Sequence, residues 1–245
     1  MEYCFTCGNG ENRKYLEVEC PECGRKYGTD INLAGKNEKE YNRIVGIAGA
    51  VKIPEHYIGN SWDKTYIKST QYKYAEDQLF DRFLGQLEKI HNLFVAGVIP
   101  GKSALIIAPP KFSKVTWAYS CMQACISHNI RVAPLLDTVE VKRLLIKGGE
   151  NPDYKMFGYL TLENYITTDV VFISVTKSDY KFSASSTIID ILDKRSRKGL
   201  PTFIISRYGS HIIARDDVYK EFESILDDCD KTDDLKYPAV ITYEI

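Results

Sequence analysis

The sequence predicts an α/β fold in which a parallel, five-stranded sheet is flanked by helices. Five apolar runs of six to eight residues alternate with segments whose apolar residues recur at helical spacing. This alternation indicates parallel strands, because a parallel connection must cross over the sheet and usually does so as a helix. The 245 residues, 44% of them hydrophobic, are enough for one sizeable core. Two cysteine pairs near the start of the chain predict a small additional module.

The predicted strands and helices follow one another along the chain. Apolar runs that are typical of buried strands occupy 103–108, 130–136, 169–175, 201–207 and 238–245. Apolar residues at three- and four-residue steps, typical of amphipathic helices, occur over 75–94, 115–128, 137–147, 184–197 and 216–228. Open parallel sheets bind their ligands at the carboxyl ends of the strands, so we expect the functional residues at that edge.

Four cysteines near the start of the chain form two Cys-x-x-Cys pairs, Cys4 with Cys7 and Cys20 with Cys23. Each pair offers two thiolates to one ion, and the 12 residues between the pairs suffice for a hairpin that brings them together. Four thiolates suit a tetrahedral zinc ion, whereas a redox Cys-x-x-Cys normally stands alone before a helix. We therefore predict a structural zinc ribbon over 1–36, whose folding energy comes from metal binding.

The charge of this ribbon indicates what it contacts. Residues 1–36 contain five basic and six acidic side chains. A ribbon that gripped DNA phosphates would be basic, so docking to a protein is favoured over DNA binding. The whole chain is balanced too, with 32 Lys and Arg against 33 Asp and Glu, which excludes a histone-like or polybasic protein.

Two observations bear on cellular location. The sequence has no run of about 18 apolar residues, so we expect neither a transmembrane helix nor a membrane partner. Its first ten residues, MEYCFTCGNG, lack the basic and apolar segments of a signal peptide. We therefore expect a cytoplasmic location, which is the host cytoplasm if the protein is viral.

A linker and pre-core segment is predicted over 37–74, between the ribbon and a core that occupies 75–245. Residues 29–45 are polar and charged, as linkers commonly are. Further on, lysines interleave with tyrosines, namely Lys64, Lys68 and Lys73 with Tyr66, Tyr72 and Tyr74. Such a pattern can bind a single strand of nucleic acid by stacking and charge neutralisation, but a solvated, partly packed surface loop is the preferred interpretation.

A phosphate-binding loop must follow a strand and open a helix, so that backbone amides and the helix N-terminus face the phosphates. The segment GVIPGKS, 97–103, ends in Gly-Lys-Ser, but its spacing is one residue short and it precedes a strand. We interpret it as a loop that enters the sheet. The segment APPKFSKVT, 108–116, follows the first strand and leads into a helix, so it is the predicted phosphate loop. Its candidate nucleotide- or phosphate-binding residues are Pro110, Lys111, Ser113, Lys114, Val115 and Thr116.

Three stretches are similar in order and pattern to parts of one known family. SALIIAPPKFSKVTWAYSCMQACISHNIRV (103–132) is similar to its strand, phosphate loop and following helix. STIIDILDKRSRKGLPTFIIS (186–206) is similar to the helix-to-strand segment after its acidic motif, and IPEHYIGNSWD (53–63) to the sequence before its core. On these stretches, the chain from about Ile53 to its end resembles the DnaC/DnaI/IstB group of AAA+ helicase loaders.

This resemblance implies a fold, a role and partners. The fold is a P-loop NTPase core of AAA+ type, and a cysteine-rich zinc module before that core is a known arrangement in such loaders. The role is that of an accessory protein in DNA replication. The implied partners are a replicative helicase or another replisome protein, single-stranded DNA and further copies of the chain. The implied nucleotide is ATP or ADP.

The loop departs from the family pattern at most of its defining positions. Ala108, Lys111 and Ser113 stand where the family has glycine. Only Lys114 matches the invariant lysine, and Val115 occupies the position of the hydroxyl that would hold magnesium. Without glycines and that hydroxyl, the loop lacks the means to wrap the phosphates and anchor the metal.

The remaining strands depart from the family pattern as well. Ser174 and Val175 end the third strand where the family has one or two carboxylates, and Asp179 lies four residues further on. Arg207 stands in place of the polar sensor of the fourth strand, and the sequence ends on a strand without the helical lid of many AAA+ proteins. Phosphoryl transfer depends on positioning and electrostatics. We therefore expect no useful ATPase, no catalytic residues, and ATP or ADP bound weakly or not at all.

One dense basic cluster consists of Lys194, Arg195, Arg197 and Lys198. It could contact DNA phosphates or a neighbouring subunit. The slightly preferred alternative is structural, because cations in the last turn of a helix complement its dipole and Gly199 can then cap it. Arg207 and Arg215 are further candidates for such contacts, and Arg215 falls near an arginine of the loaders that reaches the next protomer. The four histidines are scattered and suggest neither a metal site nor a Ser/His/Asp group.

The leading hypothesis is therefore a replication accessory protein of helicase-loader type, from a phage or mobile element, that has lost hydrolysis. One alternative is a working ATPase with an unorthodox loop, in which Asp179 supplies the metal carboxylate. Another is a zinc-dependent nucleic-acid-binding protein that uses the P-loop fold as a scaffold. Nucleotide turnover would favour the first alternative, and salt-sensitive binding to single strands without a helicase would favour the second.

Overall fold

The computed structural model describes seven ranges of the chain and five single residues between them. The ranges are 38–59, 62–71, 76–109, 114–137, 161–175, 184–206 and 240–243, and the single residues are 74, 112, 140, 147 and 224. The predicted zinc ribbon with its four cysteines lies outside the described residues. So do eight other residues that the sequence singled out, namely Tyr72, Lys73, Pro110, Lys111, Ser113, Asp179, Arg207 and Arg215.

A five-stranded parallel sheet forms the centre of the fold. Its strands are β1 (Ala104–Ile107), β2 (Leu136–Asp137), β3 (Val171–Val175), β4 (Thr202–Ser206) and β5 (Val240–Thr242). They lie in the order β2-β3-β4-β1-β5, and every neighbouring pair is parallel. All residues of β1, β3 and β4 are buried, as expected for strands that are covered on both faces. The predicted parallel α/β fold is confirmed.

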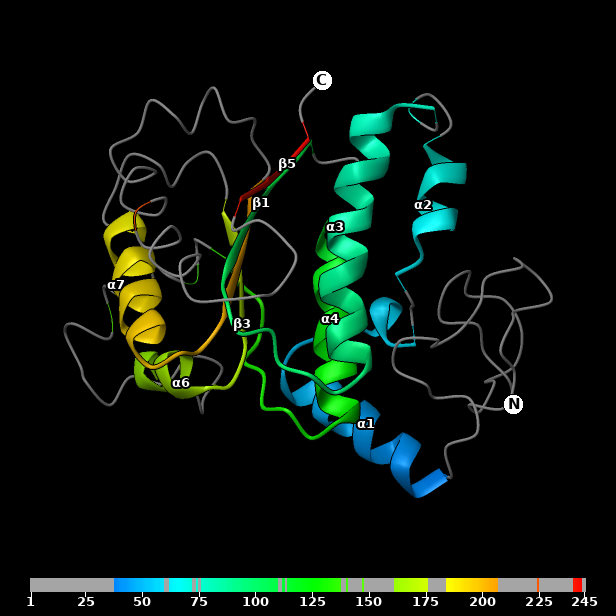
Figure 1. The fold of residues 1–245 in the computed structure, drawn as a ribbon. Coiled ribbons are helices and arrows are strands. Elements are labelled where there is room, and N and C mark those ends of the chain that lie inside the picture. Colours follow the sequence, from blue (N-terminus) through cyan, green and yellow to red (C-terminus); the bar gives the residue numbers. More distant parts are fainter. Residues whose placement is uncertain are drawn as a thin grey trace.

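Helices cover both faces of the sheet (Figure 1). They are α1 (Glu38–Ala50), the short 3-10 helix η1 (Glu55–Tyr57), α2 (Lys64–Thr70), α3 (Gln78–Val95), α4 (Lys114–Ser127), α6 (Leu162–Thr167) and α7 (Ala184–Arg197). Figure 1 shows α3 and α4 on one face and α6 and α7 on the other, with α2 beside α3 and α1 near the end of α4. No helix in the described part of the chain combines the length and hydropathy that a membrane span requires.

The run 130–136 is the one predicted strand that forms only in part. Val132 makes a single bridge with Val170, and the ladder resumes at Leu136 and Asp137 of β2. Pro134 lies between them, and proline has no backbone N–H to donate to a ladder. This edge of the sheet is therefore short.

The segment predicted as a linker is part of the core. Residues 38–50 form helix α1, in which Ile44 and Ala48 are fully buried. Further apolar residues of this segment belong to the main core cluster, namely Ile53, Ile58, Trp62 and Ile67. The expected linker is therefore wrong for 38–45, and the core begins well before the predicted boundary at 75. In the described part of α1, Ile44 and Ala48 are buried one helical turn apart and Val45 packs against the core. The polar first half of the helix favoured a linker over an amphipathic helix.

Two polar side chains of α4 hold this early segment in place. The Gln123 Oε1 accepts from the Gly59 backbone N–H at 2.8 Å, and its Nε2 donates to the Tyr57 carbonyl at 2.9 Å. The Ser120 Oγ accepts from the Trp62 backbone N–H at 3.1 Å. Both α4 side chains are fully buried, so these bonds satisfy the Tyr57 carbonyl and the N–H groups of Gly59 and Trp62 without water.

Ser120 also pairs with a histidine, which the sequence did not suggest. The His91 Nε2 lies 3.0 Å from the Ser120 Oγ, and both residues are buried. The pair joins α3 to α4 and, through Ser120, to the backbone of Trp62. Since Ser120 is wholly enclosed, the pair serves packing rather than nucleophilic attack.

The segment 97–103 enters the sheet as a loop, as predicted. Gly97 has φ of +73°, and a Cβ there would lie 2.8 Å from the Nδ1 of His128, so the turn after α3 requires glycine. Ser103 is buried at the start of β1, and its Oγ accepts from the Thr202 N–H of the neighbouring strand at 2.9 Å. The Gly-Lys-Ser sequence therefore lies at the amino edge of the sheet and not at the ligand edge.

Candidate functional site

The strand order brings three strand ends together at the carboxyl edge. Ile107 of β1 is level with Ser206 of β4, which is level with Val175 of β3. This edge lies towards the top of Figure 1, where β1 leads to the start of α4. A strand end, the loop after it and a helix start are the elements from which phosphate sites are made. The predicted phosphate loop therefore stands between the end of β1 and the start of α4.

Lys114 is the first residue of α4 and points back towards the loop. Its side chain is buried, and its Nζ donates to the carbonyls of Ala108 and, at 2.7 Å, Pro109. An ammonium has three donors, and two are used here by the carbonyls that follow β1. The lysine thus closes the loop onto the end of its own strand. Val115 and Thr116, in the same helical turn, are half-buried.

Phe112 fixes the middle of the loop by packing among other aromatic rings. It is fully buried, and its ring centroid lies 4.9 Å from that of Phe80, 5.1 Å from Tyr243 and 5.5 Å from Tyr74. These four residues are called the edge aromatic cluster below. A glycine-rich loop follows bound phosphates with its backbone, whereas this loop is held to the core by a large side chain. The sequence offered no signal for the cluster beyond an abundance of tyrosine.

Tyr243 ties the edge aromatic cluster to the sheet and to α3. Its backbone N–H donates to the Ile107 carbonyl at 2.9 Å, and its hydroxyl donates to the Asp77 Oδ2 at 2.6 Å. The other Asp77 oxygen accepts from the N–H of Leu79 at 2.8 Å and so caps α3. The bond from Tyr243 lowers the pKa of Asp77, while burial and the same bond raise the pKa of Tyr243 above its ordinary value.

Among the residues that the structure describes, the ends of β3 and β4 carry no carboxylate that could hold a metal ion. Ser174 and Val175 are buried at the end of β3 and carry no carboxylate. Asp137 of β2 is level with Ser174, but its Oδ1 accepts from the Glu140 N–H at 2.9 Å. It also lies three strand spacings from β1, or about 14 Å, which is too far to share a metal with the loop. The described residues contain no group of three His, Cys, Asp or Glu side chains that could hold a metal.

The basic cluster at the end of α7 divides into exposed and buried members. Lys194 and Arg197 are exposed and pair with Asp190 and Asp193, one turn back, both at 2.8 Å. Lys198 lies 3.7 Å from a Glu163 oxygen. Pairs of this kind on a surface are weak, so these three cations stay accessible to a partner.

Arg195 does not contact DNA or another subunit, because it is completely buried. Its guanidinium donates to four backbone carbonyls and one hydroxyl, those of Tyr165, Thr168, Asp169 and Pro201 and the Oγ1 of Thr202. Burial lowers the pKa of Arg195 to about 10, so the side chain stays charged at neutral pH. That part of the contact hypothesis is wrong.

Gly199 ends α7 as the structural interpretation of the cluster predicted. Its φ is +66°, its N–H donates to the Ser196 carbonyl at 2.9 Å, and the Leu200 N–H donates to the Arg195 carbonyl at 2.9 Å. This is a glycine C-cap, in which a left-handed residue lets the last carbonyls find donors. The predicted cap is confirmed.

Comparison with known proteins finds a likeness among solved structures. No protein-family model matches the chain, and no curated protein matches it. A solved structure titled "Crystal Structure of the DnaI" is similar at 15% sequence identity and a TM-score of 0.48. The match covers 79% of this chain and 93% of that chain.

Proposed function

We propose that this protein is an accessory factor of DNA replication of the helicase-loader type, with an AAA+-like core that does not hydrolyse ATP. Its partner in this proposal is a replicative helicase or another replisome protein. Single-stranded DNA and a second copy of the chain are further contacts, to which Lys194, Arg197, Lys198, Arg207 and Arg215 could contribute. The zinc ribbon serves as the docking module.

The main support for this proposal is that β1, β4 and β3 lie next to one another, so that their carboxyl ends meet at one edge of the sheet. In the resembled family the phosphate loop, the polar sensor and the acidic motif follow these three strands, so their ends must lie side by side. The sheet meets that requirement, with α4 beginning directly after the loop. The residues at the edge are unsuited to hydrolysis, because Lys114 is bound to loop carbonyls and β3 ends without a carboxylate. The architecture therefore supports a loader, and the residues support an inactive one.

The proposed zinc ribbon rests on its four cysteines, Cys4, Cys7, Cys20 and Cys23. Two Cys-x-x-Cys pairs make a complete tetrahedral shell, which leaves no position open for catalysis. A zinc ion held in this way supplies the folding energy of a short module. With five basic and six acidic residues, the ribbon suits a protein surface better than a phosphate backbone.

Hydrolysis is tested by a phosphate-release assay on the purified chain, alone and with DNA and a replicative helicase. We expect no release of phosphate above background, because magnesium finds neither the hydroxyl at Val115 nor a carboxylate at Ser174. Any nucleotide binding should be weak, depend on Lys114 and depend little on magnesium. The matched variant is Lys114→Met, which keeps the length of the side chain without its charge. Turnover that Lys114→Met abolishes would show instead a working ATPase, with Asp179 as the candidate metal ligand.

The partner is tested by capture from native lysate with the full chain and with a chain that lacks 1–36. We expect the full chain to retain a replicative helicase and the shortened chain to lose it, while any affinity for single-stranded DNA stays nearly unchanged. Loss of DNA binding on removal of 1–36 would contradict docking. Salt-sensitive binding to single strands without a retained helicase would show instead a zinc-dependent nucleic-acid-binding protein.

A further inference from the structure

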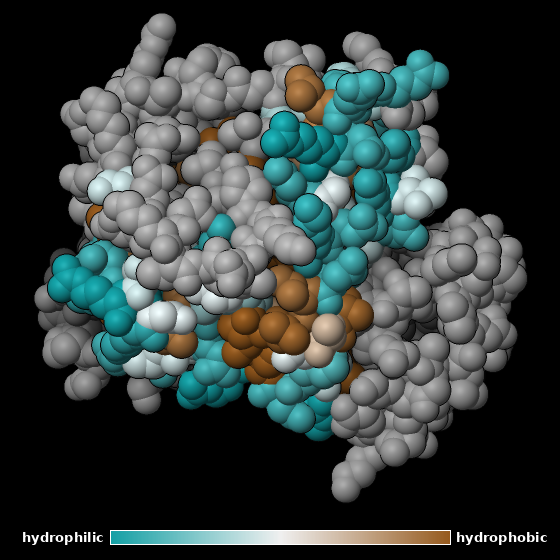
Figure 2. Space-filling view, viewed as in Figure 1, coloured by the Kyte–Doolittle hydropathy of each residue, from teal (hydrophilic) through white to brown (hydrophobic). Residues whose placement is uncertain are grey.

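Exposed apolar side chains lie at both ends of α3. Leu79 in its first turn is 65% exposed, and Val98 and Ile99 in the loop after the helix are 47% and 39% exposed. In the space-filling view a hydrophobic patch lies below the hydrophilic surface over α3 (Figure 2). Single exposed apolar residues need no explanation, but these three lie on one helix and the loop that follows it. They can therefore contact one and the same partner.

The side of α3 that is turned away from α4 and the sheet joins these two ends. At 3.6 residues per turn, one face of the helix consists of Leu79, Arg82, Gln86, Lys89, Leu93 and Ala96. We call these residues, together with Val98 and Ile99, the outward face of α3. From 79 to 96 it measures about 26 Å, at a rise of 1.5 Å per residue.

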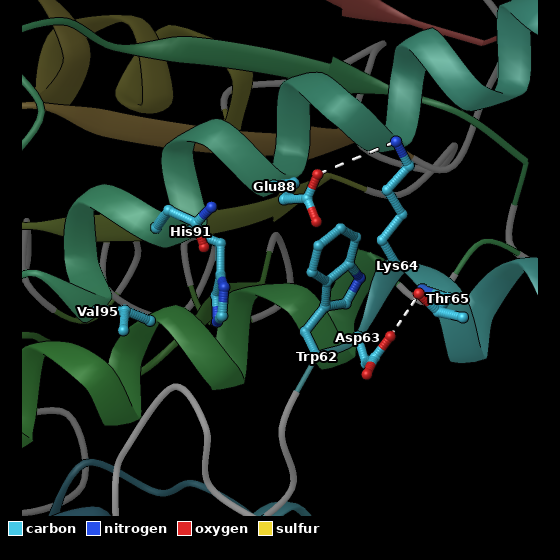
Figure 3. A pocket seen from close by; sticks show the side chains of 8 residues that line it. Trp62, Asp63, Lys64, Thr65, Glu88, His91 and Val95 are labelled. Atoms are coloured by element: carbon cyan, nitrogen blue, oxygen red, sulfur yellow. Dashed lines mark hydrogen bonds and ion pairs between the residues drawn. The ribbon is translucent and has the colours of Figure 1, made fainter. Parts of the chain in front are cut away.

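The ion pairs of α3 separate its charges. The helix has two acidic residues, Asp81 and Glu88, and both face α2. The Asp81 Oδ1 lies 2.9 Å from the Lys68 Nζ and 3.3 Å from the Lys64 Nζ. Figure 3 shows Glu88 directed at Lys64, whose Nζ lies 4.0 Å from its Oε2, at the pocket between the two helices. The outward face therefore contains cations but no carboxylate.

The two cations of the outward face, Arg82 and Lys89, are exposed and lie two helical turns apart. Among the basic side chains that the structure describes, they are the two that make neither an ion pair nor a hydrogen bond. Carboxylates lie within 4.0 Å of six others, namely Lys64, Lys68, Arg131, Lys194, Arg197 and Lys198. Arg82 and Lys89 can thus bind an acidic partner without giving up a bond within the chain.

The apolar end of the outward face is fixed by the cap of α3. Gly97 has φ of +73°, and its N–H donates to the Phe94 carbonyl at 2.9 Å. The Val98 N–H donates to the Leu93 carbonyl at 2.8 Å, which completes a Schellman cap. This cap holds Val98 and the adjacent Ile99 in place, so a partner meets an apolar surface that is already ordered.

The chemistry of the outward face fits a protein better than a nucleic acid. A DNA strand carries one charge about every 3.4 Å, so its phosphates would meet only two cations over about 26 Å. Its backbone would also leave the apolar ends of the face without a contact. A protein segment that has apolar side chains at its ends and carboxylates between them complements each part of the face.

We propose that the outward face of α3 binds an acidic, amphipathic segment of a protein partner. Apolar side chains of that segment pack on Leu79 at one end and on Val98 and Ile99 at the other, and its carboxylates pair with Arg82 and Lys89. None of these residues belongs to the loop after β1 or to 1–36. The partner bound here is therefore not restricted to the helicase of the proposed function.

The test is an NMR titration of the full chain with two synthetic helical peptides of the same length as α3. One peptide has leucines at both ends and glutamates between them, and the other has lysines in place of the glutamates. We expect the glutamate peptide to shift the amide signals of the outward face and to saturate at concentrations on the order of 100 μM. Its binding should weaken as salt is added, and the lysine peptide should not saturate.

Two double variants separate the charged and the apolar contributions. Arg82→Gln with Lys89→Gln should weaken the binding of the glutamate peptide about fivefold, because two exposed ion pairs are lost. Val98→Ser with Ile99→Ser should weaken it about tenfold, because one end of the peptide loses its apolar contact.

The matched control is Lys194→Gln with Arg197→Gln, which removes the same two charges from α7 on the other face of the sheet. We expect it to leave the affinity unchanged. No saturable shift on the outward face, equal weakening in the control, or unchanged binding in the serine variant would overturn the proposal. Tighter binding of oligothymidine to the same signals would show a nucleic-acid site instead.

Discussion

Replacing Arg195 with methionine should destabilise the protein by about 3–5 kcal/mol, because the guanidinium is buried and all of its partners would be left without a donor. Its donors join the end of α6, the start of β3 and the start of β4 through main-chain carbonyls. Methionine fills a similar volume but offers no N–H group. The effect therefore measures the lost hydrogen bonds and not an empty cavity.

Thermal and urea unfolding of Arg195→Met measure this effect. For a chain of this size a loss of 3 kcal/mol lowers the midpoint temperature by roughly 10 °C. Arg197→Met is the matched control, because Arg197 is exposed and pairs with Asp193, one turn back on the same helix. We expect it to change the stability by less than about 0.5 kcal/mol. Equal effects of the two variants would show that the bonds of Arg195 add nothing to stability.

Replacing Cys20 with serine should remove the zinc ion from the chain and unfold the first 30 or so residues. Structural zinc contributes about 10–16 kcal/mol of binding free energy in short modules, and three thiolates do not complete the tetrahedral shell. The described residues from 38 onwards, in contrast, form a core of their own, which includes Ile44, Trp117 and Phe172. The core should therefore melt at an unchanged temperature.

Metal analysis of protein purified without chelator checks this expectation, together with limited proteolysis of the N-terminal segment. The unaltered chain should carry one zinc ion, and Cys20→Ser should carry less than one. Thr6→Ala is the matched control, because Thr6 lies within the first Cys-x-x-Cys pair and offers no thiolate. An unaltered chain without stoichiometric zinc would contradict the ribbon.

The sheet and the end of α7 were predictable because local patterns define them. Buried parallel strands are continuous apolar runs, and four of the five predicted runs contain a complete strand of the sheet. Gly199 indicated the end of α7, because a C-cap residue with left-handed backbone conformation is usually glycine, whatever the helix packs against. Apolar runs and glycine C-caps depend on residues that are adjacent in the sequence. They can therefore be recognised without knowledge of the fold.

Helix α1 and the role of Arg195 were not predictable in the same way. Ile44 and Ala48 of α1 are buried, and this burial depends on α4, which begins about 70 residues further on. Arg195 looked like one more cation in a helical last turn, and its sequence neighbours Lys194 and Arg197 are indeed exposed. What separates it from them is the position of carbonyls 26 to 30 residues earlier.

In the candidate site, too, some features could be predicted from the local sequence and others depend on residues far away in the chain. The place of the loop after β1 and before α4 was readable from an apolar run followed by a helical pattern. The burial of Phe112 in this loop depends on the ring of Tyr243, whose hydroxyl binds Asp77, 166 residues away in the sequence. The spacing of residues in the sequence indicates whether a side chain belongs to a helix or a strand. Its contacts with residues far away in the sequence depend on how the elements pack, and no local sequence pattern indicates them.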